Sequence, residues 1–472
     1  MKLIIAGYNI DSSLIKQLNS SQATPEVISA AYARISRSAK SVDELRIEAI
    51  QELEKARKSN TNIVFEMGHA SVAEHAVFNL DLIDVSRLLT ESVQRSRLAS
   101  FTEKSQRYVT FGRDYLIPNE INAIPKLKKK YTELMKKLFA EYEASYSILL
   151  TNYKEQHSGI KLRELEGMAK EDARYILPLS TLTQMGITIN ARSAEALLRR
   201  LSNIPLAEAN TLKQLLYDQL SAIAPSLIRH TEADGFKGTI DLDKVGFSNF
   251  LQQELPWLAE LDYESKVKTI STPKNADDAV LSALVYANSE LGWQDNLDTV
   301  SKLPKIAREQ LWQQVFRGIR SWHKLPRAFE AAEYEFELHL SEACWAQLKR
   351  HRTCTMLKKA NSSGLHVIPD SIKQIKRDKI WQQLAVESQL LSDSLPDNLK
   401  PMSGYLKLNS SLCRVYVKMN LREIYHFVRL RSDEHAQWEI REISDAISRI
   451  VQRSAPNAAR CLSGKSEFKP GL

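Results

Sequence analysis

The sequence predicts an α+β protein in which helices dominate and which consists of two tandem copies of one module. Each copy is expected to hold a small, mostly antiparallel sheet flanked by long helices. Three observations support this prediction. The chain of 472 residues is too long for one ordinary core. Several motifs recur once in each half. Each half also joins a strand-like alternation to amphipathic helical stretches.

The boundary between the copies is expected where the helical pattern stops. Asp234-Gly-Phe-Lys-Gly238 interrupts that pattern with two glycines. We therefore expect the first module to span residues 1–238 and the second to span residues 239–472.

Strands are predicted at the start of the chain and once near the middle of each half. The apolar run Met1–Gly7 is too short for a signal peptide, so a buried strand is the better interpretation. Residues 76–84 and 334–340 alternate apolar and polar side chains with a period of two, which indicates half-buried strands. A loop is expected at Ser271–Asp277.

Helices are predicted where apolar residues recur at three- and four-residue steps. The predicted stretches are residues 26–57 and 193–222 in the first half and 372–393 and 433–453 in the second. The buried face of the last stretch is expected to consist of Trp438, Ile440, Ile443, Ile447 and Ile450. Residues 124–157 are expected to form a helix inserted in the first half, because corresponding motifs lie further apart there.

The composition favours some classes of function and excludes others. A net charge of +8 favours anionic ligands such as nucleotides, folates or nucleic acid, although a lysine-rich solvated surface is the alternative interpretation. The four cysteines form no Cys-x-x-Cys pair, which argues against a disulfide framework or structural zinc and fits a cytoplasmic location. No apolar run is long enough to predict a membrane span.

Two stretches look like complementary halves of one signature. The first runs from Arg95 to Tyr108 and keeps the tail Glu-x-Ser-x-Arg-Tyr, but Ser96 stands where the second stretch has His351. The second, Gln347–Thr355, keeps Gln-x-x-Arg-His-Arg and has lost the tail. We expect the two copies to have divided one active site between them.

The paired arginines in these stretches are candidate anion-binding groups. On an extended segment, two arginines one residue apart face the same side and can grip one anion through their planar guanidinium groups. A basic surface cluster is the alternative for a single Arg-x-Arg. Finding Arg95/Arg97 and Arg350/Arg352 at matched places in a duplicated chain favours binding.

The tail Glu103–Tyr108 is a candidate phosphate loop. Its short side chains and backbone amides suit a phosphate, with Ser105 as hydroxyl donor and Arg107 as charge partner. The alternative is a polar turn before a strand starting at Tyr108.

His69-Ala-Ser71-Val-Ala-Glu74-His75 is a third cluster of polar residues. Two histidines and a glutamate raise the possibility of a metal site, but no further Cys or His ligand pattern accompanies them, so no metal is expected. In the second half the matching region is residues 324–330, where the pattern is lost.

Taken together, these motifs resemble the signatures of flavin-dependent thymidylate synthases. The Arg-His-Arg centre, the Glu-x-Ser-x-Arg-Tyr tail and the His-x-Ser-x-x-Glu-His run match that family. So do Ala-Arg174-Tyr-Ile-Leu-Pro and the closing signature, which runs from Asn420 through Arg431 to Arg441. The likeness covers most of both halves.

The resemblance implies a set of site residues, each kept in one copy. The implied substrate-binding residues are Glu103, Ser105, Gln106, Arg107, Arg174, Gln347, Arg350 and Arg431. The implied cofactor-binding residues are His69, Ser71, Glu74, Arg350, His351, Arg352, Asn420, Arg422, His426 and His435. Ser105 and Arg431 are expected to act directly in catalysis.

The resemblance also implies an activity. It implies conversion of dUMP to dTMP, with FAD as cofactor, methylenetetrahydrofolate as carbon donor and NADPH as reductant. Members of the family are tetramers with sites at subunit interfaces. We therefore expect a homodimer that acts as a pseudo-tetramer, with composite sites between the modules.

Two other functions fit the same residues. One is flavin- and folate-dependent alkylation of another pyrimidine nucleotide. The other is a non-catalytic protein that binds nucleotides or RNA on the same scaffold. The absence of basic stripes with interleaved aromatic residues counts against nucleic acid.

Overall fold

A computed structural model describes residues 1–17, 20, 22–112, 114–229, 231–232, 265–359 and 364–469. The expected module boundary at residues 238–239 lies outside these ranges. So do Ala360, Ser362 and Ser363, which occupy three of the tail positions in the second copy.

The described residues form two four-stranded antiparallel sheets with the same topology. The first has the order β1-β2-β4-β3, and its strands are β1 (Lys2–Tyr8), β2 (Val77–Ser86), β3 (Ala99–Glu103) and β4 (Leu182–Asn190). The second has the order β5-β6-β8-β7, and its strands are β5 (Val267–Ser271), β6 (Glu333–Ser341), β7 (Thr355–Lys358) and β8 (Leu412–Asn420). The predicted fold class of two helix-rich copies with one small sheet each is confirmed.

The central strands alternate as predicted. Phe78, Leu80 and Leu82 of β2 are buried while Asn79 and Asp81 are exposed. The first strand differs from the prediction, because only Leu3 of β1 is buried. It lies at the edge of its sheet, where one side has no neighbouring strand to cover it.

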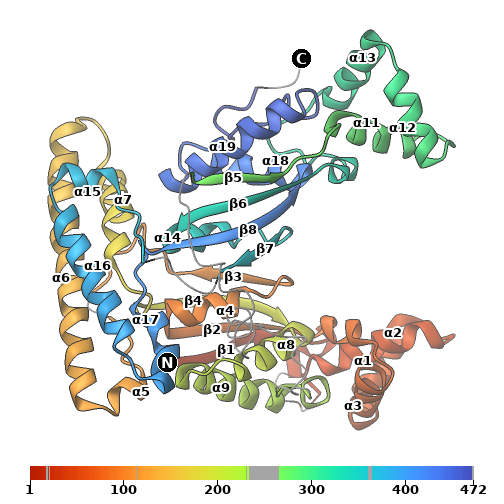
Figure 1. Ribbon diagram of the computed structural model, residues 1–472. Helices are drawn as coiled ribbons and strands as arrows, with labels where there is room; N and C mark the ends of the chain where they lie inside the picture. The colour runs from red at the N-terminus through yellow and green to blue at the C-terminus, as the bar shows by residue number, and fades with distance from the viewer. Residues whose placement is uncertain are drawn as a thin grey trace. The chain divides into compact units, whose positions relative to one another are not determined.

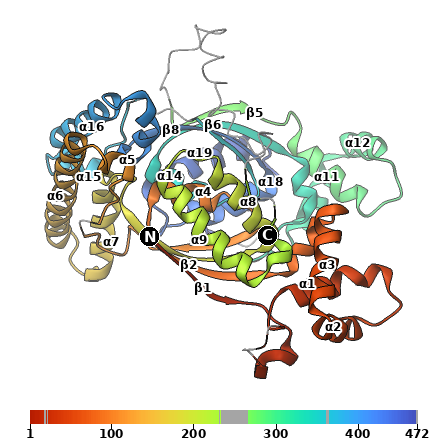
Figure 2. The same ribbon diagram turned by 90° about the horizontal axis from the view of Figure 1, so that it is seen from below.

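Helices of the first half are shorter than predicted because local signals divide them. The stretch 26–57 separates into α1 (Glu26–Arg34), α2 (Val42–Gln51) and α3 (Leu53–Thr61), and Ser41 starts α2 with a capping box to Glu44. The stretch 193–222 divides at Pro205 into α8 (Ala191–Ser202) and α9 (Ala207–Ile223). Figure 2 shows α8 and α9 crossing the same face of the first sheet.

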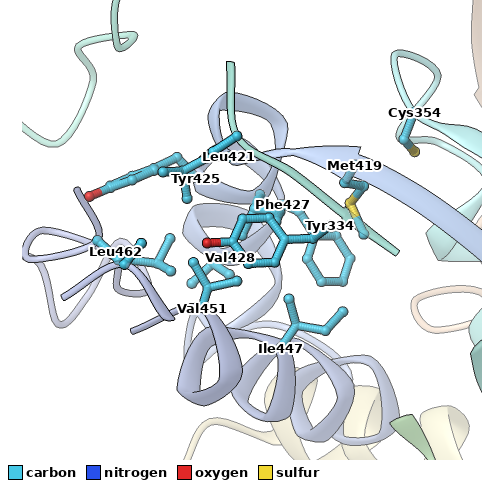
Figure 3. Packing of buried hydrophobic residues seen from close by; sticks show 14 of the residues in the cluster. Tyr334, Cys354, Met419, Leu421, Tyr425, Phe427, Val428, Ile447, Val451 and Leu462 are labelled. Carbon is cyan, nitrogen blue, oxygen red and sulfur yellow. The ribbon is translucent and has the colours of Figure 1, made fainter. Parts of the chain in front are cut away.

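The α-helices described in the second unit pack with the second sheet. They are α11 (Ala276–Tyr286), α12 (Trp293–Lys302), α13 (Lys305–Phe316), α14 (Glu342–Leu348), α18 (Leu421–Arg431) and α19 (Trp438–Ser454). The predicted face of α19 is buried at Ile440, Ile443 and Ile447. Ile447 faces Phe427 and Val428 of α18 and Tyr334 of β6 (Figure 3).

The chain separates into two compact units, and the first unit contains residues from both halves of the sequence. The first unit lies within Met1–Leu258 and Ile368–Asn409, and the second within Ala259–Val367 and Ser410–Leu472. In the first unit, α6 (Pro125–Gln156) and α7 (Leu162–Ala173) lie beside α15 (Asp370–Gln374) and α16 (Asp378–Asp393) (Figure 1). The remaining α-helices of this unit are α4 (Arg87–Gln94), α5 (Asn119–Asn122) and α17 (Ser403–Leu406).

The buried carboxylate of Glu141 joins the segment Ile368–Asn409 to α6 of the first unit. Glu141 of α6 accepts a hydrogen bond from Arg377 Nε at 2.9 Å and from Trp381 Nε1 at 3.0 Å. The helix predicted as an insertion, α6, has a counterpart in α16 of the second half. The two helices contain 32 and 16 residues, so the first copy lengthens an element that both copies have.

Matching hydrogen bonds define which residues of the two copies correspond. Ser86 caps α4 and binds the carboxylate of Glu208 through its amide at 2.7 Å and its hydroxyl at 2.6 Å. Ser341 caps α14 and binds Glu439 in the same way, at 2.7 and 2.5 Å. Upstream of these serines the register shifts by one residue, because β2 has an irregularity at Ile83/Val85 that β6 lacks.

Candidate functional site

The Arg-x-Arg motifs lie in turns that follow equivalent helices. Arg350 is exposed and Arg352 is half-buried, whereas His351 between them is only 3% exposed. In the first copy Arg95 and Arg97 are exposed and Ser96 is buried. The segments are turns rather than the extended segments assumed in the sequence argument, and in each the central residue is buried while its neighbours are exposed or half-buried.

His351 is held between a carboxylate and an arginine of the second unit. Its Nε2 accepts a hydrogen bond from Arg431 Nε at 3.0 Å, and its Nδ1 lies 3.4 Å from Glu423. Because Nε2 accepts, the ring proton of the neutral form stands on Nδ1, facing Glu423. Burial lowers the pKa of His351, and the positive charge of Arg431 acts in the same direction.

Glu423 is itself held in place. Burial tends to raise the pKa of this carboxyl, but the His351 ring 3.4 Å away and the hydrogen bond from the Thr353 hydroxyl outweigh burial and lower it. Glu423 therefore stays ionised and fixes the imidazole. The first copy has Ser193 at this position, so the triad of carboxylate, imidazole and arginine exists only in the second copy among the described residues.

The arginine of this triad has a true counterpart in the first copy. Arg431 Nη2 donates to the carbonyl of Gln347 at 3.2 Å, and Arg200 Nη1 donates to the carbonyl of Ser92 at 2.9 Å. Arg200 also donates to the hydroxyl of Ser96 at 3.3 Å. The two arginines therefore make equivalent hydrogen bonds, although Arg431 lies about one residue further along its helix than Arg200 does.

The other predicted residues of the second unit divide into structural and exposed groups. Asn420 caps α18 through the amide of Glu423 at 2.9 Å, as Asn190 caps α8. Arg422 binds Glu330 at 3.1 Å and the carbonyl of Leu325 at 2.8 Å. His426 and His435 are exposed, and the His426 ring lies 5.5 Å from that of His351. Gln347 is buried.

The His69–His75 run forms a short 3-10 helix, Ala70–His75, in the first unit. His69 and Ser71 are exposed, and Glu74 binds Arg192 at 2.6 Å. The sheet register makes Glu330 the counterpart of Glu74, because each pairs with the matching arginine of its own copy. The glutamate of this run is thus retained in the second half, one residue away from where sequence spacing placed it.

In the first unit, the tail Glu103–Tyr108 forms the end of β3 and a turn, with no strand after it. Glu103 accepts hydrogen bonds from Arg87 Nη1 at 3.0 Å and from Gln94 Nε2 at 2.9 Å. The Ser105 hydroxyl oxygen accepts a hydrogen bond from the backbone amide of Arg107 at 3.2 Å, which shapes the turn.

This turn and nearby segments form a cluster of polar side chains, which we call the arginine cradle: Arg87, Gln106, Arg107, Arg174 and Asn409. Gln106, Arg174 and Asn409 are buried, and Arg87 and Arg107 are half-buried. Arg107 pairs with Glu171, and Arg174 Nε donates to the carbonyl of Glu171 at 3.1 Å. Burial lowers the pKa of Arg174, and the positive charges of Arg107 and Arg87 contribute to the shift. The positive charges of Arg107 and Arg87 thus act on the buried guanidinium group of Arg174.

Several polar atoms of the cradle have no hydrogen-bond partner among the described residues. They are Nε of Arg87, Nε2 of Gln106, Nη2 of Arg174 and Oδ1 of Asn409. Gln106 and Arg174 are 2% and 6% exposed. Buried polar atoms in natural proteins nearly always have a hydrogen-bond partner, so these three donors and the Asn409 amide oxygen indicate that a ligand or ordered water completes them. Their charge favours an anion.

The second copy has changed at the corresponding positions. Glu342 and Lys358 form an ion pair at 2.7 Å where the first copy has Arg87 and Glu103, so the two charges have exchanged places. Gly404 stands where the first copy has Arg174. A Cβ atom on Gly404 would lie 2.9 Å from Leu88 Cδ2, so this leucine fills the space of the missing side chain.

Three residues of these clusters escaped sequence analysis. Asn409 belongs to the second half but joins the cradle of the first unit, and nothing in the chain order indicates that. Arg87 and Glu423 lie in the first turns of α4 and α18, and neither is among the site residues that the sequence predicted. Comparing the copies position by position could have found both, since their counterparts are Glu342 and Ser193.

The described ranges contain neither a metal-binding cluster nor a membrane-spanning helix. No group of three or more His, Cys, Asp or Glu side chains there is placed to hold a metal ion. None of the helices described is long and apolar enough to cross a membrane.

Comparisons with known proteins agree with the duplication. A family model described as thymidylate synthase complementing protein matches residues 17–226 and 270–457. A UPF0159 protein, Ta1429, of Thermoplasma acidophilum is 24% identical over 441 residues, covering 84% of this chain and 86% of that protein. A flavin-dependent thymidylate synthase of Clostridium tetani is 31% identical over 209 residues, covering 44% of this chain and 82% of that enzyme.

One solved structure is a looser match. A UMP/dUMP methylase, PolB, of Streptomyces cacaoi bound with 5-Br dUMP is 17% identical, with a TM-score of 0.36. It covers 41% of this chain and 92% of its own chain, and a score this low supports no inference about the site.

Proposed function

This chain belongs to the thymidylate synthase complementing protein family, and we propose that it is a flavin-dependent thymidylate synthase. The proposed reaction converts dUMP to dTMP, with methylenetetrahydrofolate as carbon donor and NADPH as reductant. Relatives named for this activity support the proposal.

The arginine cradle is the observation that carries it. A nucleotide monophosphate brings a phosphate dianion, which suits the buried donors of Gln106 and Arg174 beside two further arginines. The turn at Ser105–Arg107 adds backbone amides and a hydroxyl near the same place. The cradle would orient the nucleotide by its phosphate and exclude water from it.

The residues of the second unit fit the needs of FAD. Arg350 and Arg352 flank a buried residue and so offer two guanidinium groups to an anionic pyrophosphate, while His426 is exposed nearby. His69 and Ser71 offer exposed donors in the first unit. Asn420 and Arg422 are proposed to bind FAD as well, in addition to the hydrogen bonds that they make within the second unit. When bound, FAD supplies hydride transfer.

Arg431 is the residue proposed to act on the base. A fixed positive charge beside a uracil oxygen stabilises the negative charge that develops as C5 becomes nucleophilic. Arg431 suits this role because His351 and the Gln347 carbonyl hold its guanidinium in place. Ser105 is proposed to donate its hydroxyl hydrogen to the substrate while its oxygen accepts the Arg107 amide.

We infer that the active site draws on both copies and that the corresponding second site is inactive. The exchange of Arg87–Glu103 for Glu342–Lys358, and the filling of the Gly404 position by Leu88, support the loss of the second site. We also propose a homodimer that acts as a pseudo-tetramer, module limits of 1–238 and 239–472, and a cytoplasmic location.

The exchanged ion pair provides a sharp test. The double variant Arg87→Glu with Glu103→Lys reproduces the pair of the second copy, so the thermal unfolding midpoint should stay near that of the wild type. Its dUMP affinity, measured by calorimetry, should fall at least about tenfold, or about 1.4 kcal/mol, because a cation of the cradle becomes an anion. Wild-type protein should bind FAD. It should oxidise NADPH only when dUMP and methylenetetrahydrofolate are present.

The other functions would give different results. Turnover with a different pyrimidine nucleotide but not dUMP would indicate the alternative alkylation. Protein that takes up no FAD and binds dUMP with unchanged affinity in the double variant would contradict the proposed enzyme.

A further inference from the structure

The segment that ends at Asn409 meets its own counterpart within the first unit. The amide of Leu179 donates to the carbonyl of Lys407 at 2.7 Å, and the amide of Asn409 donates to the carbonyl of Leu177 at 2.8 Å. Pro178 and Leu408 form the antiparallel bridge between them. Counting back from the aligned strands β4 and β8 makes Leu179 the counterpart of Asn409.

Asn409 is fully buried at this junction and reaches the arginine cradle. Its Nδ2 donates to the backbone carbonyl of Arg174 at 2.9 Å and to Oε1 of Gln106 at 3.0 Å. A carbonyl oxygen can only accept, so the contact with Arg174 fixes which end of the Asn409 amide faces the cradle.

That orientation fixes the next amide in turn. Because Asn409 presents nitrogen, Gln106 must present its oxygen to Asn409 and turn its own Nε2 the other way. This Nε2 is one of the buried donors without a partner among the described residues. With the Gln106 amide reversed, an oxygen would face the same place and repel an anion.

We propose that Asn409 is a positioning residue that makes Gln106 a donor to the substrate phosphate, and this proposal rests on the proposed function. Asn409 acts through Gln106 and the Arg174 backbone and need not touch the substrate. Leu179, its counterpart, has no polar group to do the same. One copy has therefore acquired a side chain that completes the phosphate site formed by the other.

The test compares dUMP with deoxyuridine, which lacks the phosphate. Asn409→Leu installs the counterpart residue, and its dUMP Kd should rise about tenfold while the deoxyuridine Kd changes less than about twofold. The Gln106→Ala and Asn409→Leu effects on dUMP binding should not add in the double variant, because both remove the same donor. Leu179→Met is the matched control at the same junction and should leave both constants unchanged.

A second variant guards against loss of folding. Asn409→Ala removes the same donor without adding a charge or a larger apolar side chain, so it should also weaken dUMP binding selectively. Equal weakening of dUMP and deoxyuridine, or additive effects of Gln106→Ala and Asn409→Leu, would overturn the positioning role. Wild-type protein that binds no dUMP would overturn the proposed function as well, whereas dUMP binding that is unchanged in Asn409→Leu overturns only this inference.

Discussion

At the scale of single residues, the two copies use different side chains to bind equivalent arginines. In the second copy a buried imidazole accepts from Arg431, and in the first a serine hydroxyl accepts from Arg200. The imidazole adds a titratable group that the first copy lacks. Because burial lowers the pKa of His351, the folded protein keeps this ring neutral at pH values where the unfolded chain is protonated.

This difference predicts a pH-dependent stability. As pH falls below the unfolded value of about 6.5, the unfolded chain binds a proton that the folded protein does not, so the free energy of unfolding decreases. The contribution of His351 is fully present above that value and is lost as pH falls toward the lowered pKa of the folded state. Its slope is at most about 1.4 kcal/mol per pH unit.

His351→Ser installs the residue of the first copy and should remove this part of the slope. Urea unfolding between about pH 5.5 and 7.5 measures it. A variant whose stability has the same pH dependence as the wild type would show that His351 titrates normally.

At the scale of elements, the sequence predicted the first strand, the two central strands and the helical stretches, but not β3, β4, β5, β7 or β8. It also predicted helix in residues 372–393 without indicating that this segment belongs to the first unit. Alternation in residues 76–84 and 334–340 identified β2 and β6 because one face of each is buried and the other is polar. The long helical stretches were found, but their breaks at Ser41 and Pro205 were missed. The placement of α16 against α6 depends on the buried Glu141–Arg377 contact, which joins residues far apart in the chain.

Packing at α17 predicts a coupling between two substitutions. Gly404→Ala adds a methyl group close to Leu88, and overpacking of this kind costs about 1–3 kcal/mol. In a Leu88→Ala background the same substitution should be neutral or stabilising, because alanine favours a helix over glycine by about 1 kcal/mol. Urea unfolding of the two single variants and the double variant gives the coupling energy. Additive effects would mean that Leu88 does not fill the position opposite Gly404.

At the scale of the whole molecule, the duplicated chain acts as its own comparison. The Ser86–Glu208 and Ser341–Glu439 pairs are kept in both copies and serve the fold. His351, Glu423, Arg87 and Arg174 are kept in one copy only and belong to the clusters on which the proposed site rests. Sequence motifs gave the complementary pattern directly, because each motif is local. They could not give the arginine cradle, since Asn409 and Arg174 come together only through tertiary packing.

The division of labour between the copies is the central claim, and a pair of matched variants tests it most directly. Arg352 and Arg97 are counterparts in equivalent turns, so their alanine variants remove the same group from each copy. The measurement is kcat/KM for dUMP-dependent oxidation of NADPH at one fixed FAD concentration, below saturation of the wild type, with methylenetetrahydrofolate at saturation. We expect Arg352→Ala to lower it at least about 100-fold, or about 2.7 kcal/mol, and Arg97→Ala to lower it less than about threefold. Equal losses in the two variants would contradict the claim.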